Sequence, residues 1–197
     1  MTLLRQQEIN NYTEFLDLAD FLAPKESGMT DYVGVFAVTA GIGADELAKK
    51  YEADNDDYMS IMTKAVADRL SESFAEVLHM EIRKQYWGYA PDENLSLDEI
   101  IRVKYQGIRP AFGYPSLPDI SIQKEIFKVF DITKKTGIRL SENFIMIPAA
   151  AVSGLIFAHP KSKYFNIGKI DADQETDYAK RKNISVEDLK RFLIKNI

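Results

Sequence analysis

The chain has 197 residues, no cysteine and a net charge of −5, with 46% hydrophobic and 28% charged residues, which is ordinary for one globular domain with a sizeable core. The negative charge argues against a nucleic-acid partner, because no basic stripe is present to meet phosphates, and the lack of cysteine excludes disulfides and thiolate metal sites. No apolar run is long enough to span a membrane, and the polar start does not resemble a signal peptide, so the sequence favours the cytoplasm.

The first half of the chain predicts one strand and a long helix. Near the start, four apolar residues are expected to tuck against the body: Leu16, Leu18, Phe21 and Leu22. Residues 32–39 are rich in β-branched and aromatic side chains and predict a buried strand. A short helix over 44–51 and a long helix over about 56–87 follow. Helical spacing places six apolar residues of the long helix on one side, which we expect to be its apolar face: Met59, Met62, Val66, Leu70, Phe74 and Val77.

The second half mixes short helices and strands. Ser96 and Glu99 form a capping-box pattern for a helix that runs to about residue 105, and Gly137 is a candidate C-cap for a helix over 121–135. The remaining predicted elements are strands at 144–147, 152–157 and 164–167 and helices at 176–182 and 185–195. Because strands and helices do not alternate regularly, we predict a single α+β domain. Its sheet should be twisted and largely antiparallel, with the long helix and several shorter helices around it.

Polar side chains on the long helix are a candidate interaction surface. Asp68, Glu72 and His79 fall at i, i+4 and i+11, so they share a side opposite the predicted apolar face. The pattern is typical of a solvated polar face. It is also compatible with a docking surface, since a carboxylate pair can stabilise a cationic or imidazole group of a partner. Nothing in it indicates an acid/base active site, and the acidic run at 52–57 lacks the glycine and terminal glutamate of a calcium loop.

The segment at 105–115 is the strongest candidate for a binding loop. Prolines and glycines brace it, and its single cation is Arg109. The guanidinium carries five donors in a planar fork that suits a carboxylate or phosphate. An ordinary connection with a surface arginine has the same composition, so chemistry alone leaves both readings open.

Residues 107–115, Gly-Ile-Arg-Pro-Ala-Phe-Gly-Tyr-Pro, resemble the hallmark of the activation domain of cobalamin-dependent methionine synthase. Similar motifs recur in order along nearly the whole chain, including Ala-Asp-Arg-Leu at 67–70 and Tyr-Trp-Gly-Tyr-Ala-Pro at 86–91. In that family the hallmark loop binds S-adenosylmethionine. The resemblance implies that Arg109 holds the ligand carboxylate and that the ligand also meets Ala111, Tyr114, Tyr164 and Phe165. Phe165 replaces a tyrosine of the family pattern, and Val103 stands where the family often has an acidic residue.

The resemblance also implies a function. The family reactivates methionine synthase, a methyltransferase that makes methionine from homocysteine, by reductive methylation of cob(II)alamin. Asp68 and Glu72 would dock on the cobalamin-binding module, and flavodoxin or a related reductase would supply the electron. The family's domain is longer, so we expect this chain, 1–197, to be an incomplete activation domain that lacks the N-terminal part and is inactive when isolated. The alternative is a non-catalytic interaction module that docks on a cobalamin-binding protein or flavodoxin. A stand-alone methyltransferase is disfavoured because no glycine-rich nucleotide fold is evident.

Overall fold

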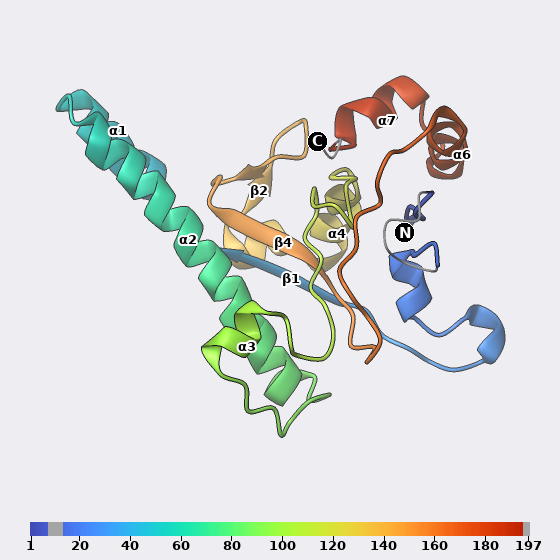
Figure 1. Ribbon diagram of the computed structural model, residues 1–197. Helices are drawn as coiled ribbons and strands as arrows, with labels where there is room; N and C mark the ends of the chain where they lie inside the picture. Colours follow the sequence, from blue (N-terminus) through green and yellow to red (C-terminus); the bar gives the residue numbers. More distant parts are fainter. Residues whose placement is uncertain (8–13, 195–197) are drawn as a thin grey trace.

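A two-stranded antiparallel sheet with a long helix packed on one face forms the centre of the molecule (Figure 1). The computed structural model describes residues 1–7 and 14–194. Strand β1, Gly34–Thr39, pairs with β4, Ala151–Ile156, from Gly34 opposite Ile156 to Thr39 opposite Ala151. A second small antiparallel sheet joins β2, Arg139–Leu140, to β3, Met146–Ile147. The predicted α+β class with antiparallel pairing is confirmed.

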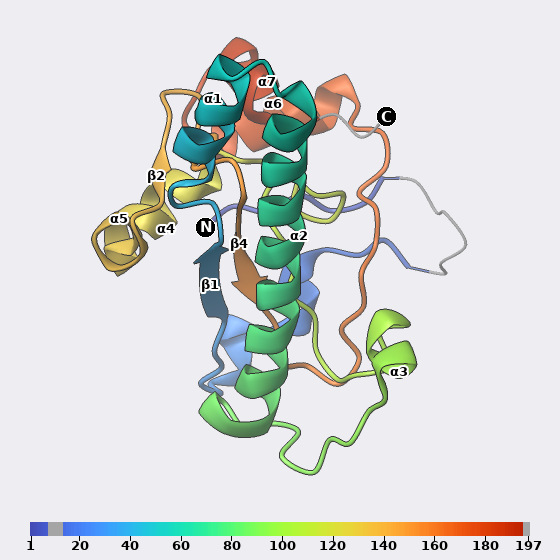
Figure 2. The same ribbon diagram turned by 90° about the vertical axis from the view of Figure 1, so that its left-hand side faces the viewer.

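The long helix α2 spans Asp57–Glu81 and continues into a π-helical turn, Ile82–Tyr86, close to the prediction. It begins where the Asp56 side chain accepts a hydrogen bond from the N–H of Met59, which satisfies one free donor of the first turn. Helix α1, Ala44–Ala53, packs against α2. Figure 2 shows α2 lying in front of β1 and β4, roughly along the strands.

The orientation of α2 contradicts the sequence-based prediction. Small side chains face the sheet, and the apolar stripe faces outward, with Leu70 55% and Phe74 50% exposed. The reason lies at Ser71, which is buried among backbone groups. Its Oγ donates to the carbonyl of Ala150 at 2.7 Å and accepts from the N–H of Ala40 at 2.9 Å. Such close contact between helix and strand ends requires small residues, so Ala67, Ser71 and Ala75 occupy the buried face.

Shorter helices follow α2 along the chain. They are α3 (Leu97–Ile101), α4 (Ile122–Phe130), α5 (Ile132–Thr136), α6 (Ala172–Lys182) and α7 (Val186–Phe192). The capping box of Ser96 and Glu99 is present, and Gly137 ends α5 in a left-handed conformation. Two predicted helices are shorter than expected, because Val103 and Asp131 have positive φ angles of 55° and 54° that interrupt helical hydrogen bonding. Residue 195, the predicted end of the last helix, lies outside the described residues.

The predicted strand at 164–167 is wrong. This segment forms no regular strand; instead, the Tyr164 hydroxyl and the N–H of Ile167 bond to residues of the 105–115 segment. Residues 144–147 contribute only the two residues of β3. The main core contains Leu155, Phe157 and Phe165, together with Leu16, Leu18 and Phe21 from the start of the chain, as predicted. Two short 3-10 helices lie in this region, η1 (Leu18–Phe21) within the apolar segment and η2 (Lys25–Ser27) after it. No helix among the described residues is long and apolar enough to cross a membrane.

Candidate functional site

Residues 105–115, here called the Arg109 loop, bond to the edge of β4 that β1 does not occupy and so form an irregular third strand. Ile108 and Phe157 exchange both backbone hydrogen bonds, at 3.0 and 2.9 Å. Farther along, the N–H of Leu155 donates to the carbonyl of Pro110 at 3.0 Å, and the N–H of Phe112 donates to that of Ser153 at 3.0 Å. This approach depends on Gly154, because a Cβ there would lie 2.2 Å from the Pro110 oxygen. The loop is therefore part of the sheet rather than a loose connection.

Arg109 points from this loop toward α2. Its Nη2 donates to Oε2 of Glu76 at 2.6 Å, and its backbone N–H donates to the hydroxyl of Tyr164 at 2.9 Å. The two charged side chains are only 16% and 30% exposed. Burial alone would lower the pKa of Arg109, but the hydrogen bond and charge of Glu76 outweigh it, so the pKa is raised. Nε of Arg109 and Oε1 of Glu76 are buried without a hydrogen-bond partner, so the ion pair does not use the full hydrogen-bonding capacity of either group.

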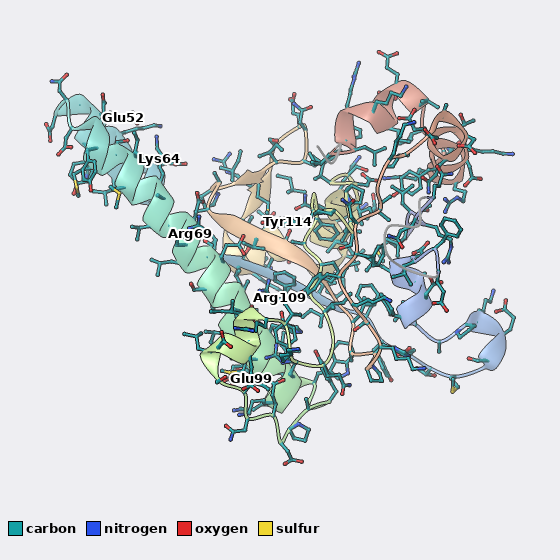
Figure 3. All side chains as sticks on the ribbon, viewed as in Figure 1. Glu52, Lys64, Arg69, Glu99, Arg109 and Tyr114 are labelled. Carbon is teal, nitrogen blue, oxygen red and sulfur yellow. The ribbon has the colours of Figure 1, made fainter. Side chains whose placement is uncertain are left out.

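A cavity of about 620 Å³ opens beside the ion pair, within the usual size range of small-molecule sites. Its wall combines three tyrosines with carboxylates and apolar residues of the 100–103 segment: Tyr105, Tyr114, Tyr164, Glu72, Glu76, Ile100, Ile101 and Val103. The Tyr114 hydroxyl donates to Oε1 of Glu72 at 3.1 Å. Figure 3 shows Arg109 and Tyr114 on the loop that runs beside β4. One cation, two carboxylates and aromatic rings suit a ligand that carries both an anionic group and a positive charge.

A buried polar layer lies against Tyr105, which borders the cavity. Arg83 forms two 2.7 Å hydrogen bonds with the carboxylate of Glu93, and its guanidinium lies 4.1 Å from the ring centre of Tyr105. His79 is 1% exposed, and its Nε2 lies 3.2 Å from the hydroxyl of Tyr89. Burial, with Arg83 and Arg109 nearby, lowers the pKa of His79 to about 3. The imidazole is therefore neutral near pH 7 and adds no positive charge behind the site.

Two comparisons with known proteins bear on this site. The family model of the activation domain of vitamin B12 dependent methionine synthase matches residues 1–183. The chain belongs to this family. The resemblance stated from the sequence is thereby confirmed.

This activation-domain chain is also similar to a solved structure described as the MetH reactivation domain bound to AdoHcy. The two share 52% sequence identity with a TM-score of 0.91, and the match covers 99% of this chain and 60% of that one. The chain thus spans about three fifths of the length of the structure it matches. Over the shared part, the two have the same fold.

The activation domain brings most of the predicted site residues together. Arg109, Ala111, Tyr114, Tyr164 and Glu72 all border the cavity. Phe165 also borders it, but this side chain is buried in the main core with its ring centre 6.4 Å from that of Phe21. Their individual roles in ligand binding remain predictions.

The predicted polar side of the long helix does not stay together as one surface. Asp68 is exposed and does not line the cavity, whereas His79 is buried in the layer behind it. The expected shared face is therefore wrong for His79. Glu76 was overlooked, although it follows Glu72 by four residues and so lies on the same side of the helix. Among the described residues, no group of three His, Asp or Glu side chains could hold a metal ion.

Proposed function

We propose that this chain binds S-adenosylmethionine in the cavity beside Arg109 and serves the reactivation of cobalamin-dependent methionine synthase. Family membership supports the proposal, as does the AdoHcy bound by the similar reactivation domain. The single observation that carries it is the guanidinium-bearing side chain of Arg109, largely buried on the wall of a 620 Å³ cavity. S-adenosylmethionine supplies an electrophilic methyl group for the reductive methylation of cob(II)alamin, and the protein's part is to hold and orient it.

Each part of the ligand is assigned to different residues of the cavity. Arg109 holds the carboxylate with its guanidinium, because a charge-assisted bond to a guanidinium is short and strong. Ala111 presents backbone, and its small side chain leaves room beside the loop. The rings of Tyr114 and Tyr164, with Phe165 at the border, face the sulfonium or adenine. The negative charges of Glu72 and Glu76 offset the positive charge of the sulfonium.

The partners follow from the same assignment. Asp68 and Glu72 are proposed to dock on the cobalamin-binding module, where carboxylates can accept hydrogen bonds from a cationic or imidazole group. Flavodoxin or a related reductase is the proposed electron donor. Because homocysteine methylation needs modules that these 197 residues do not contain, the isolated chain is expected to bind ligand without turnover.

Calorimetric titration with S-adenosylmethionine tests the assignment. Arg109→Ala is expected to weaken binding by about 10- to 100-fold, since a hydrogen bond to a charged group contributes about 1.5–3 kcal/mol. Arg191→Ala, which removes an exposed arginine of α7, is the matched control and should bind like the wild type. Circular dichroism checks that both variants are folded.

Equal binding by wild type and Arg109→Ala would refute the site. If the wild type does not bind the ligand but does bind a cobalamin-loaded module, with Asp68→Asn weakening that complex, the chain is a non-catalytic interaction module. That alternative has support in the exposed carboxylate of Asp68, which lies outside the cavity.

A further inference from the structure

The ionised side chains on the wall of the cavity do not balance one another. Among the described residues that line it, Glu72 and Glu76 are negative near pH 7 and Arg109 is positive, which leaves an excess of one negative charge (2 − 1). Arg109 is paired with Glu76. The carboxylate of Glu72 instead accepts a hydrogen bond from the neutral hydroxyl of Tyr114. Such a wall favours a ligand whose own net charge is positive.

The buried layer against Tyr105 adds no net charge to this wall. Its one cation, Arg83, is compensated by Glu93 through two hydrogen bonds of 2.7 Å, and the two side chains are 0% and 7% exposed. His79 is neutral near pH 7, because burial and the neighbouring arginines lower its pKa to about 3. The excess negative charge therefore belongs to the carboxylates that α2 presents to the cavity.

The packing of α2 holds both carboxylates in place. Glu72 directly follows Ser71, whose hydroxyl bonds to the backbone at the strand ends. Glu76 directly follows Ala75, which is buried in one apolar cluster with Ala111 of the Arg109 loop. These contacts fix the helix, and the Glu76 side chain is only 30% exposed. A charge in such a partly buried position acts more strongly than one on the open surface, since less water and salt screen it.

The methyl donor and its product differ by one unit of charge. S-adenosylmethionine has a carboxylate, an ammonium group and a sulfonium, so it carries one net positive charge near pH 7. When the methyl group leaves for the reduced cobalamin, the electron pair of the broken S–C bond stays on sulfur. The product, S-adenosylhomocysteine, then has a neutral thioether and no net charge. The excess negative charge of the wall is matched by the methyl donor and not by the product.

We propose that Glu72 and Glu76 make the cavity select the methyl donor over its demethylated product, so that the loss of the sulfonium charge promotes product release. The inference rests on the proposed function and deepens it, because ligand binding by itself does not require the site to distinguish the two molecules. With the product in place, one carboxylate charge of the wall has no balancing charge on the ligand. The product therefore dissociates more readily, and the site is free for a new methyl donor.

Calorimetric titration of the full chain with each molecule tests this selectivity. S-adenosylhomocysteine is a suitable neutral probe, since the similar reactivation domain is described with AdoHcy bound. We expect the wild type to bind S-adenosylmethionine at least ten-fold more tightly. Glu76→Gln should lower this ratio of dissociation constants by about ten-fold, or about 1.4 kcal/mol, mainly by weakening the binding of S-adenosylmethionine. Its amide oxygen can still accept the hydrogen bond from Arg109, so the variant removes the charge and keeps the contact.

Glu72→Gln is a second variant with the same expected result, because its amide oxygen can still accept from Tyr114. Glu187→Gln is the matched control and should keep the wild-type ratio, since this side chain is 83% exposed on α7 and does not line the cavity. Circular dichroism checks that all three variants are folded.

Three results would overturn the inference and leave the proposed function intact. The first is equal affinity of the wild type for the two molecules. The second is an unchanged ratio in both cavity variants, which would assign the selectivity to contacts with the methyl group. The third is an equal loss of affinity for both molecules in Glu76→Gln, which would make Glu76 only a positioning residue for Arg109. No binding of either molecule by the wild type would refute the proposed function itself, and this inference with it.

Discussion

The buried histidine behind the cavity makes the folding stability depend on pH in a way that can be calculated. The His79 side chain is too deeply buried for water to solvate a charge, and its Nδ1 lacks a hydrogen-bond partner. Arg83 and Arg109 lie close enough to oppose a positive charge on the imidazole. Burial, followed by these two cations, lowers the pKa of the imidazole from 6.5 to about 3. The hydroxyl of Tyr89, whose own pKa burial raises to about 12, faces Nε2, and the ring of Tyr105 meets the imidazole edge-on.

The sign follows from comparing the folded and unfolded chains. Between pH 6.5 and pH 3 the unfolded chain binds a proton at His79 and the folded chain does not, so stability falls as the pH is lowered through this window. At about 1.4 kcal/mol per pH unit below the unfolded pKa, this residue alone should cost about 2 kcal/mol between pH 7 and pH 5. That is a large fraction of the stability of an ordinary domain.

Urea unfolding at pH 7 and pH 5 measures this effect. His79→Gln cannot titrate, so its loss of stability between the two pH values should be smaller than that of the wild type by about 2 kcal/mol, whatever its stability at pH 7. His159→Gln, which removes the other histidine at an exposed position, is the control. Equal losses in wild type and His79→Gln would refute the claim that this imidazole is neutral in the folded chain.

Two further substitutions test the framework of the site. Gly154→Ala places a Cβ 2.2 Å from the Pro110 oxygen and should push the Arg109 loop off β4. We expect calorimetry to show at least ten-fold weaker ligand binding and thermal melting to show a loss on the order of 2 kcal/mol; a variant with wild-type binding would contradict this role of the glycine. Glu93→Gln leaves the fully buried guanidinium of Arg83 without its counter-charge and should cost about 3–5 kcal/mol in urea unfolding. Asp98, which forms an exposed ion pair with Arg102, supplies the control, because Asp98→Asn should change stability by less than about 0.5 kcal/mol. Similar losses of stability in the two variants would contradict the buried character of the Arg83–Glu93 pair.

The sequence predicted helix ends well where the capping residues act on nearby backbone groups. Ser96 with Glu99 and Gly137 each act on groups within a few residues, so their effect does not depend on the rest of the fold. The predicted strand at 164–167 failed for the opposite reason. Its aromatic residues are used to bond and pack against the Arg109 loop rather than to pair in a ladder, a contact between segments about 55 residues apart.

The candidate site shows the same division. The residues of the Arg109 loop are visible in one short motif, which is why the sequence predicted Arg109, Ala111 and Tyr114 together. The Glu76 partner of Arg109 comes from another element 33 residues earlier. Glu76, and not Asp68, pairs with Arg109 because of where α2 meets the Arg109 loop. Helical spacing alone does not give that position.

The sequence by itself determined the family, the helix boundaries set by caps and glycines, and the cation at the centre of the candidate site. Only the tertiary structure decided which face of α2 is buried. Hydrophobicity predicted the stripe of Val66, Leu70 and Phe74 as the apolar face, but the sheet lies so close to the helix that only Ala67, Ser71 and Ala75 fit between them. Burial follows from the distance at which elements pack, and that distance belongs to the whole fold rather than to any one segment.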